Sequence, residues 1–598
     1  MSLNDQLSEL FHNFAALMEL KGENVFKVIA FQKVGRIIRE LNIDLKKCIE
    51  EGKLCEIEGI GKSSQQIIEE FVETGKSSAY EDLAKSVPEG LVPMLGIEGI
   101  GPKTINLFWK QLDITSLDQL SKAIADGKLA KIKGMGEKKI AAILKGIENY
   151  KSRLNADGSV PRRTGIADAM EQAEPLVEAV RKIPGVARAE IAGSLRRRKE
   201  TIGDVDLIAA VKNLSDAGKV IEEFVKLPGV VQTLGAGESK ASVKVANGMQ
   251  VDLRVVPREN FGAALMYFTG SKEHNVKIRG LAQKQKMTLN EWGLYEIAKY
   301  EKAKKETAKP PPIKAVASES EESIYQSLGI VYVEPEMRED FGEVELARDN
   351  KLPKLITLKD IRGDLHTHTN ASDGRNTIEE MAAAAKAAGY EFLAITDHSK
   401  AMAMANGLTV DRLIKHIEQI HKVSDKLKGI TLLAGAEVDI LADGRMDYED
   451  DVLKLLDIVV ASPHVSLKQD TKKATDRLLR AIDNKYVNII GHPTGRLINT
   501  REGLPLEMDK LFKAAAANGT ALEINAGYPR LDLNDIHARA ALAAECMLAI
   551  DTDSHTANFE EIKWGIGVAR RAWATPKNVI NCMKLPDLKK FLAAKRGR

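Results

Sequence analysis

The stretch GSLRRRKETIGDVDL, from Gly193 to Leu207, decides how the middle of this chain folds. A glycine–serine turn and a basic run precede a strand that carries Asp204 and Asp206. Because side chains alternate along a strand, the two carboxylates share one face while Val205 and Leu207 point into the core. Carboxylate oxygens are ligands that Mg²⁺ and Mn²⁺ prefer. The stretch therefore predicts a divalent-metal site on a sheet.

A second acidic strand, QVDLRVV, supplies a third carboxylate. Asp252 sits there among apolar neighbours, with Arg254 on the same face. A lone Asp-x-Asp pair is often only the solvated side of a strand, so the three carboxylates must be taken together. Three carboxylates that hold two divalent ions beside a triphosphate form the two-metal site of phosphoryl transfer. A further segment, YFTGS from Tyr267 to Ser271, is predicted to form a turn that leads into a helix.

Taken together, these segments resemble the palm of family X DNA polymerases. The resemblance implies that Asp204, Asp206 and Asp252 are the catalytic metal ligands, and that Asp252 helps to deprotonate the primer 3′-hydroxyl. It implies phosphate contacts from the turn, sugar contacts from the YF pair, and base and template contacts from the helix. The nucleotide-binding residues implied in this way are Gly193, Ser194, Arg197, Gly203, Tyr267, Phe268, Gly270, Asn275 and Arg279. Lys272 stands where the animal repair enzymes carry an acidic residue, so contacts with the base are expected to differ.

The N-terminal quarter contains a phrase that occurs three times, as IEGIGK, IEGIGPK and IKGMGEK, at intervals of 40 and 35 residues. Each copy lies between two predicted helical stretches. A Gly-x-Gly turn at a helix N-terminus brings free N–H groups close to a phosphate without reading the base. Three copies resemble helix-hairpin-helix motifs and imply binding to the DNA backbone. The residues concerned are Gly59, Gly61, Lys62, Gly99, Gly101, Lys103, Gly134, Gly136 and Lys138.

One departure from the family affects a second activity. In family X polymerases the first hairpin domain can excise deoxyribose phosphate through a Schiff-base lysine. Aligning GIGKSSQQIIEEFVETG with the family pattern places Ile67 where that lysine is expected. Lyase activity through this position is therefore not predicted, although Lys33 or Lys62 could still bind a 5′-phosphate.

Nine of the eleven histidines lie after residue 360, and six of these belong to short motifs at the ends of apolar strands. Ala/Leu/Lys-rich helical stretches separate the motifs, which predicts an α/β barrel-like domain with its site at the C-terminal ends of the strands. Six His, two Asp and one Glu provide nitrogen and oxygen ligands without a thiolate, a set typical of Mn²⁺, Fe or catalytic Zn²⁺ clusters. His416, His421 and His537 are interpreted as ordinary histidines.

The motif series resembles the PHP (polymerase and histidinol phosphatase) domain. The resemblance implies a trinuclear centre of Mn²⁺, or of Zn²⁺ or Fe. All nine ligand positions of the family are filled, by His366, His368, Asp373, His398, Glu437, His464, His492, Asp553 and His555. It also implies hydrolysis at DNA 3′-ends, as a 3′→5′ exonuclease and in some members a 3′-phosphatase or abasic-site endonuclease. Arg496 and Arg530 are further candidates for binding substrate phosphate.

The bulk composition is that of an ordinary soluble protein, with 44% apolar and 29% charged residues and a net charge of +2 over 598 residues. Four cysteines without CxxC spacing indicate a reducing compartment and no structural zinc. Neither a signal peptide nor a membrane span is predicted, so a cytoplasmic location is expected. The stretch from Lys299 to Ser323 is charged, rich in proline and poor in aromatic residues, and is predicted to be an extended, mobile insertion.

The predicted architecture is multidomain: an all-α helix-hairpin-helix N-terminal region, an α+β nucleotidyltransferase palm with a thumb, and a C-terminal α/β distorted barrel. The expected boundaries are 1–85 and 86–155 for the hairpin regions, 156–260 for the palm, 261–345 for the thumb with the insertion near 300–320, 346–360 for a linker, and 361–598 for the PHP domain.

The combined interpretation is a DNA repair polymerase that fills short gaps in base excision repair and trims DNA 3′-ends. Its expected partners are gapped or primed double-stranded DNA and dNTPs, with Mg²⁺ or Mn²⁺ at the polymerase site, and the chain is expected to be a monomer. Three other interpretations stay open: a template-independent nucleotidyltransferase, a small-molecule phosphatase of the histidinol phosphate type, and a non-catalytic DNA scaffold. Replacing Arg279 should leave the first of these enzymes unharmed, and activity on free histidinol phosphate would support the second. Loss of salt-sensitive DNA binding on changing the hairpin glycines, with neither chemistry detectable, would support the third.

Overall fold

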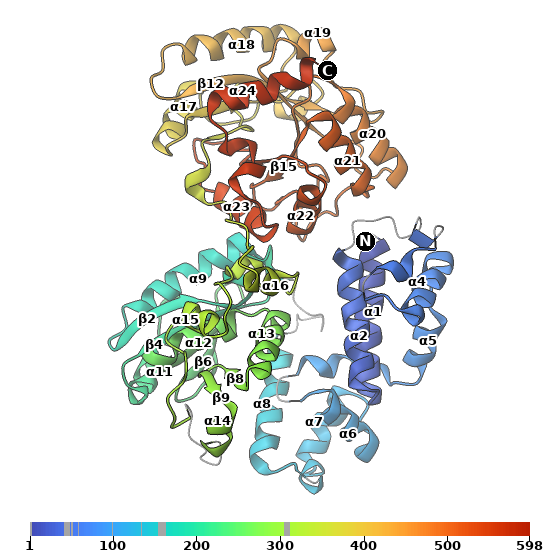
Figure 1. Ribbon diagram of the computed structural model, residues 1–598, viewed down its shortest axis with the longest axis vertical. Coiled ribbons are helices and arrows are strands. Elements are labelled where there is room, and N and C mark those ends of the chain that lie inside the picture. The colour runs from blue at the N-terminus through green and yellow to red at the C-terminus, as the bar shows by residue number, and fades with distance from the viewer. Residues whose placement is uncertain are drawn as a thin grey trace. The chain divides into compact units, whose positions relative to one another are not determined.

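A computed structural model describes residues 3–40, 48–49, 52–57, 59–97, 100–132, 134–153, 163–303 and 311–597. The chain divides into two compact units, Met1–Arg162 and Arg163–Arg598 (Figure 1). The first is helical, and the second holds a five-stranded and a seven-stranded sheet. No helix in the described ranges is long and apolar enough to cross a membrane.

Amphipathic helices and short 3-10 turns make up the first unit. Leu7, Phe14 and Leu17 recur at a spacing of three to seven residues along α1 and are at most 5% exposed. They help to form two apolar clusters, one in each half of the unit, so the prediction of an all-α N-terminal region is confirmed. The helices are α1 (Leu3–Lys21), α2 (Val25–Glu40), α4 (Lys62–Thr74), α5 (Ser78–Lys85), α6 (Pro102–Leu112), α7 (Leu117–Ala125) and α8 (Glu137–Arg153).

The five-stranded sheet lies at the start of the second unit. Its spatial order is β2 (Val186–Ile191), β4 (Asp204–Val211), β7 (Gln250–Pro257), β6 (Lys240–Val245) and β5 (Val230–Ala236). Val205 and Leu207 share an apolar cluster with α9 (Ile166–Arg181) and α11 (Ala217–Phe224). Ile208 and Ala210 pack instead with α12 (Phe261–Thr269). Because alternate residues of a strand share a face, Asp204 and Asp206 lie on the α12 side.

A smaller subdomain follows the sheet and has its own apolar cluster, which includes Ile278, Leu294 and Tyr325. It begins with α12 and ends before the segment that leads to the barrel. Its further elements are α13 (Lys272–Lys284), β8 (Met287–Asn290), β9 (Gly293–Glu296), α14 (Ile297–Ala303), α15 (Glu321–Ser327) and α16 (Glu343–Arg348).

The prediction of an extended insertion from Lys299 to Ser323 is wrong for its C-terminal end. Residues 304–310 lie outside the described residues, but Ala317 pairs with Leu294 and Glu321 is only 4% exposed. The Glu321 carboxylate lies 2.6 Å from Arg196 and 2.5 Å from Arg338. Burial opposes its charge, but the two guanidinium groups outweigh this and lower the pKa of Glu321 to about 2. The composition of this stretch suggested a solvated chain because the arginines that neutralise Glu321 lie outside the stretch.

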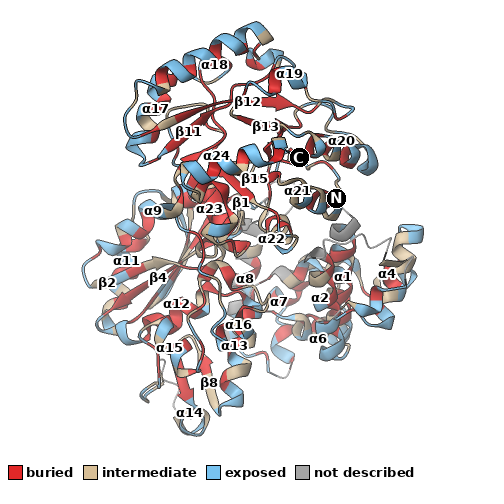
Figure 2. Ribbon diagram, turned by 45° about the horizontal axis from the view of Figure 1, so that its top comes forward, coloured by how far each residue is buried: buried red, intermediate tan, exposed pale blue. Residues whose placement is uncertain are grey.

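Seven parallel strands in sequence order form the C-terminal domain. Figure 2 shows them buried, with helices around them that expose their outer faces. Two strands have only two residues each, which makes the barrel irregular. The strands are β10 (Gly363–Asp364), β11 (Phe392–Ile395), β12 (Thr431–Asp439), β13 (Ile458–Ser462), β14 (Ile489–Ile490), β15 (Ala521–Asn525) and β16 (Leu548–Asp551).

Bonds between the segments that follow the first and last strands bring the two edges of this sheet together. Thr367 and Ser554 form a parallel bridge, and the backbone N–H of His368 donates to the Ser554 carbonyl at 2.9 Å. Beneath them, the buried Asp364 accepts hydrogen bonds from the N–H and hydroxyl of Thr552. The predicted distorted α/β barrel is thereby confirmed.

Candidate active sites in the sheet and the barrel

The three predicted aspartates lie on adjacent strands. β4 and β7 pair in parallel, with Asp206 opposite Asp252 and Asp204 opposite Gln250. Gln250 donates from Nε2 to both carboxylate oxygens of Asp252, at 2.9 and 3.0 Å. Gly203 is exposed directly before Asp204. The structure therefore gathers the three carboxylates at the N-terminal ends of two neighbouring strands.

Repulsion within this group changes the acidity of Asp206. Burial, and then the charges of Asp204 and Asp252, raise its pKa from 3.8 to about 7. A bound cation stabilises carboxylates that repel one another in this way. Gly193 lies directly against them, because a Cβ at this position would be 2.3 Å from Oδ2 of Asp206, and its φ of +62° favours glycine. Only glycine allows the backbone to approach the carboxylates this closely.

The predicted phosphate ligands lie in the 193–200 loop, which we define as α10 (Gly193–Arg196) and the turn that follows it to Glu200. Ser194 is half-buried within α10. Arg197 donates from Nε to Glu339 at 3.1 Å and from Nη1 to the Thr269 carbonyl. Gly270 lies beside it, since an added Cβ would be 3.1 Å from Nη1 of Arg197. Arg197 is thus held in place by groups outside its own loop.

The predicted sugar, base and template contacts come from the end of α12 and the first turns of α13. The rings of Tyr267 and Phe268 are 5.1 Å apart in an edge-on arrangement, and the Arg254 guanidinium lies 4.5 Å from the Phe268 ring. Asn275 donates from Nδ2 to the Tyr267 carbonyl at 2.8 Å. Arg279 is exposed further along α13. A hydrogen bond therefore links the predicted base contact to the predicted sugar contact.

Each glycine phrase of the first unit lies between a 3-10 turn and a helix. The turns are η1 (Leu54–Glu56), η3 (Pro93–Gly96) and η4 (Leu129–Lys131), and they precede α4, α6 and α8. The first glycine has a left-handed φ, +99° at Gly59 and +88° at Gly134, whereas Gly99 lies outside the described residues. Lys62 and Lys103 are exposed in the first turns of their helices, and the side chain of Lys138 is not among those described.

The second glycine of each phrase is not required by its own fold. Gly61, Gly101 and Gly136 are exposed and lie outside the left-handed region. An added Cβ at any of the three would meet nothing within 4 Å. Neither steric crowding nor a left-handed backbone requires glycine at these three positions. Their recurrence is therefore consistent with close approach of an external group to this surface.

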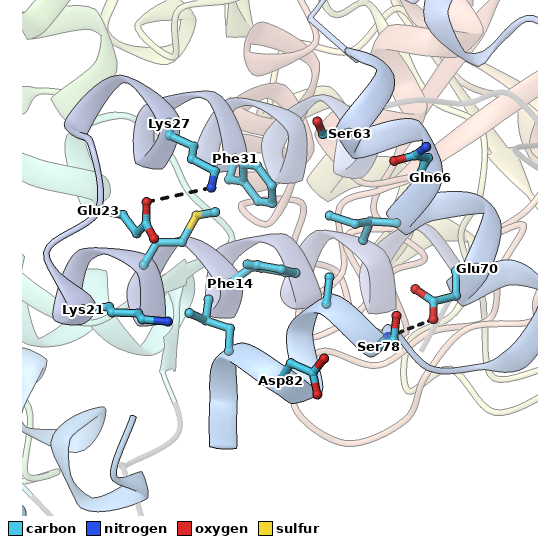
Figure 3. Close-up of a pocket in the computed structure, with 14 residues that line it drawn as sticks. Phe14, Lys21, Glu23, Lys27, Phe31, Ser63, Gln66, Glu70, Ser78 and Asp82 are labelled. Atoms are coloured by element: carbon cyan, nitrogen blue, oxygen red, sulfur yellow. Dashed lines mark hydrogen bonds and ion pairs between the residues drawn. The ribbon is translucent and has the colours of Figure 1, made fainter. Parts of the chain in front are cut away.

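A cavity of about 540 Å³ lies among α1, α2, α4 and α5 (Figure 3). Ile67, at the position of the family's lyase lysine, is 7% exposed and lines it. The lysines in the wall are Lys21 and Lys27, whereas Lys33 and Lys62 are not part of it. An aliphatic side chain cannot form a Schiff base, so this position supplies no lyase nucleophile.

The nine predicted ligands of the barrel lie at the C-terminal ends of its strands or in the loops that follow. In a parallel barrel these ends converge on one face. His366, His368 and Asp373 follow β10, His398 follows β11, Glu437 lies in β12, His464 follows β13, His492 follows β14, and Asp553 and His555 follow β16.

Eight of these residues form three overlapping groups in which the potential ligand atoms lie within 4.8 Å of one another. The ninth, His492, has its Nε2 3.0 Å from Oε1 of Glu437. The groups are His368, Asp373, His398 and His555; His366, His368, Glu437 and Asp553; and His398, Glu437 and His464.

The hydrogen bonding of this cluster fits bound metal ions. Several of its buried atoms make no hydrogen bond to any described residue. Buried polar atoms without partners are costly, and a coordinated cation would satisfy them. They include Nδ1 of His368 and Nδ1 of His492. Nδ1 of His398 instead lies 2.8 Å from Oε2 of Glu437, and Nε2 of His366 lies 3.4 Å from Oε1 of Glu437.

Electrostatics separate the histidines into two kinds. Burial opposes the charge of His398 and of His464, but Glu437 and its neighbours outweigh this and raise their pKa values to about 10 and about 9. Burial dominates at His368 and His492, whose pKa values fall to about 4 and about 3. The cluster thus concentrates negative charge around Glu437, which favours cations.

Two carboxylates that support the cluster were not predicted from the sequence. Glu523 on β15 accepts from Nδ1 of His366 at 2.7 Å and from the backbone N–H of His492. Asp439 lies 3.3 Å from Nδ1 of His464. Such partners orient metal-binding imidazoles. The available signal was a charged residue inside an otherwise apolar barrel strand, as in ALEIN.

The two arginines proposed as phosphate ligands have different surroundings. Arg530 lies with its Nε 3.5 Å from Asp553, at the cluster. Arg496 instead donates to Glu200 at 2.6 Å and to the carbonyl of Leu531. Arg496 therefore connects the barrel to the 193–200 loop, and the expectation that it binds substrate phosphate is replaced by this contact.

Comparisons with known proteins identify families for several parts of the chain. Residues 264–339 match the DNA polymerase beta thumb family and residues 364–527 the PHP domain family. Residues 2–77 match the helix-hairpin-helix domain, and residues 92–149 match the SAM-like helix-hairpin-helix tandem. A probable phosphatase of Thermoanaerobacter sp. (strain X514) is 29% identical over 39% of this chain and 96% of its own length.

A relative aligns with nearly the whole chain. The DNA polymerase/3′-5′ exonuclease PolX of Bacillus subtilis (strain 168) is 38% identical over 586 residues, 98% of each chain. The match spans the hairpin unit, the aspartate-bearing sheet and the histidine-rich barrel together. With these sites and this similarity, the chain belongs to the family X DNA polymerases that carry a C-terminal PHP domain.

Proposed function

We propose that this DNA polymerase fills short gaps in DNA during base excision repair and trims the 3′-ends of the same substrates. The observation that carries the proposal is the register of Asp206 against Asp252, with the backbone of Gly193 in contact with Asp206. This arrangement has the donor set for phosphoryl transfer from a triphosphate. The separate PHP cluster has the donor set for hydrolysis.

In the polymerase site the chain's own residues bind and orient the nucleotide. The N–H groups at the start of α10, the Ser194 hydroxyl and the Arg197 guanidinium bind the β- and γ-phosphates. Tyr267 and Phe268 lie against the sugar and disfavour a 2′-hydroxyl, and Asn275 contacts the base. Asp252 accepts the proton of the primer 3′-hydroxyl, with its carboxylate oriented by Gln250. The three aspartates would hold Mg²⁺ or Mn²⁺, which would supply charge neutralisation at the phosphates and a lower pKa for the attacking hydroxyl.

The DNA backbone binds at the glycine phrases of the first unit. The open space at Gly61, Gly101 and Gly136 allows a phosphate to reach the helix N-termini without a steric clash. The exposed Lys62 and Lys103 add positive charge beside two of these turns. Contacts of this kind are independent of base sequence, which suits an enzyme that must act at gaps in any sequence.

The PHP cluster acts as a 3′→5′ exonuclease. Its nine residues would hold up to three ions, with Mn²⁺ as the first candidate and Zn²⁺ or Fe as others. When bound, such ions would supply polarisation of a phosphate and activation of water. Arg530 binds the scissile phosphate, since its guanidinium is next to Asp553. The likeness to probable phosphatases over the barrel also favours removal of a 3′-phosphate as a second reaction.

We place the enzyme in the cytoplasm as a monomer that uses dNTPs and gapped DNA.

The test uses a labelled primer on a one-nucleotide-gapped duplex with Mn²⁺ or Mg²⁺, with and without dNTPs. It compares the intact chain with Asp204→Ala/Asp206→Ala and with His366→Ala/His368→Ala. We expect the aspartate variant only to shorten the primer and the histidine variant only to extend it. Extension by the aspartate variant, or degradation by the histidine variant, would show that a reaction has been assigned to the wrong site. Loss of both activities in both variants would contradict the assignment of two independent sites.

A further inference from the structure

The 193–200 loop is supported by the PHP domain. Two hydrogen-bonded pairs join the loop to that domain, Arg571 with Arg197 and Arg496 with Glu200. Arg198 lies beside Gly567, where an added Cβ would be 3.4 Å from the Cβ of Arg198. Arg571 and Gly567 belong to α23 (Ile562–Arg571) of the barrel domain (Figure 1).

Arg571 acts on Arg197 in two ways. Its Nη1 donates to the Arg197 carbonyl oxygen at 2.9 Å, so it binds the backbone directly after α10. The same Nη1 lies 3.0 Å from Oε1 of Glu339, the oxygen that also accepts from Nε of Arg197 at 3.1 Å. The rest of the guanidinium is held by Asp535, at 2.8 Å from Nε. Arg571 is 3% exposed, so these groups define its position.

The shared Glu339 determines how strongly Arg197 is held. While Arg571 neutralises part of the Glu339 charge, Arg197 keeps guanidinium N–H groups for another anion. Without Arg571, the positive charges left close to Glu339 are those of Arg197 and Lys199, at 3.1 and 3.6 Å. Glu339 would then compete more strongly with a triphosphate for the Arg197 guanidinium.

We propose that Arg571 of the PHP domain is a positioning residue for nucleotide binding in the polymerase site. It holds the backbone that follows α10 and shares Glu339, so that the Arg197 side chain is presented to the triphosphate. The inference rests on the proposed function, specifically on the assignment of Arg197 to the triphosphate. It makes the PHP domain a structural part of the polymerase active site.

The test measures single-nucleotide insertion on gapped DNA by the full chain, with KM for the dNTP and kcat determined separately. We expect Arg571→Ala to raise KM about tenfold or more, which corresponds to losing one charged hydrogen bond, with little change in kcat. Arg571→Lys should give an intermediate KM, because one ammonium group cannot reproduce the guanidinium hydrogen bonds to the Arg197 carbonyl, Glu339 and Asp535. Exonuclease activity on single-stranded DNA should stay unchanged in both variants.

Arg570→Ala is the matched control. Arg570 is the neighbouring residue of α23 and forms a comparable ion pair with Glu336 at 2.8 Å, but makes no hydrogen bond to the 193–200 loop among the described residues. We expect its KM for the dNTP to equal that of the intact chain. An equal rise in KM for Arg570→Ala and Arg571→Ala would mean general loosening of the interface and would overturn the proposal.

Arg197→Ala separates failure of this inference from failure of the assignment beneath it. If Arg197→Ala leaves KM unchanged, Arg197 does not bind the triphosphate and both proposals fail. If Arg197→Ala raises KM and the folded Arg571 variants do not, only the role of Arg571 is refuted. Should Arg571→Ala unfold, Arg571→Lys decides the question, because a folded Arg571→Lys with an unchanged KM refutes the proposal.

Discussion

Replacing Asp206 by asparagine should stabilise the metal-free protein while it abolishes primer extension. Asp206 is largely buried and lies close to the carboxylates of Asp204 and Asp252, and these effects raise its pKa from 3.8 to about 7. Above that pH the carboxylate is ionised in the folded state against an unfavourable environment. An amide of nearly the same shape removes this charge and leaves Val205 and Leu207 packed as before.

The magnitude follows from linkage between ionisation and folding. A carboxyl whose pKa is raised in the folded state contributes most stability below the unfolded pKa of 3.8, and this contribution is lost as the pH rises through about 7. A pKa difference of about 3 corresponds to about 4 kcal/mol, so Asp206→Asn should gain up to about 4 kcal/mol at pH 8 relative to acid pH. At about pH 5 the gain should be only about 1.5 kcal/mol.

The assay is thermal unfolding of the full chain in EDTA at about pH 5 and about pH 8, with Glu222→Gln as the control. Glu222 is an exposed carboxylate on α11, so its amide variant controls for the loss of one carboxylate charge outside the aspartate cluster. Adding Mn²⁺ at pH 8 should raise the unfolding temperature of the intact chain more than that of Asp206→Asn. The reasoning is refuted if Asp206→Asn is less stable than the intact chain in EDTA at pH 8, or if its advantage does not grow with pH.

Three further predictions concern the other parts of the chain. Glu523→Gln should weaken Mn²⁺ binding by the PHP domain about tenfold or more, because the amide no longer orients His366 as a carboxylate does; metal content after dialysis measures this, and full retention would contradict it. Gly136→Ala should weaken binding to gapped DNA without lowering the unfolding temperature. Gly218 also has open space around it, and Gly218→Ala should weaken neither DNA binding nor thermal stability. Equal DNA binding by both variants would contradict the contact between Gly136 and the DNA backbone. Glu321→Gln should lower the free energy of unfolding by about 3 kcal/mol or more at neutral pH. The folded pKa of Glu321, about 2, lies below the unfolded value of 4.5, so the difference in stability from the intact chain should shrink as the pH falls between these values. A difference that stays constant would argue against the ion pairs with Arg196 and Arg338.

The clustering of the candidate site residues could be predicted because these residues lie in short, local patterns. The Asp-x-Asp strand places two carboxylates on one face through backbone geometry alone. The barrel ligands follow individual strands, and parallel topology then brings those strand ends together. The glycine phrases could be recognised because they repeat within the chain.

Other features could not be predicted because they depend on contacts between distant segments. Glu321 lies in a stretch whose composition suggests a solvated chain, yet two arginines from elsewhere neutralise it. Arg496 follows the predicted metal ligand His492 closely in sequence and was a candidate for binding substrate phosphate, but it pairs with Glu200. Glu523 stands alone in an apolar strand, and only its distance to His366 reveals its role.

The sequence by itself therefore determined the kinds of domain and the grouping of the candidate aspartates and of the candidate PHP ligands, because each is encoded by the spacing of neighbouring residues. Only the tertiary structure decided which charges neutralise one another, and these include the Arg571–Glu339–Arg197 group that joins the two halves of the second unit. The physical reason is that an ion pair depends on distance in space, and residues as far apart as Arg197 and Arg571 come together only through the packing of whole domains.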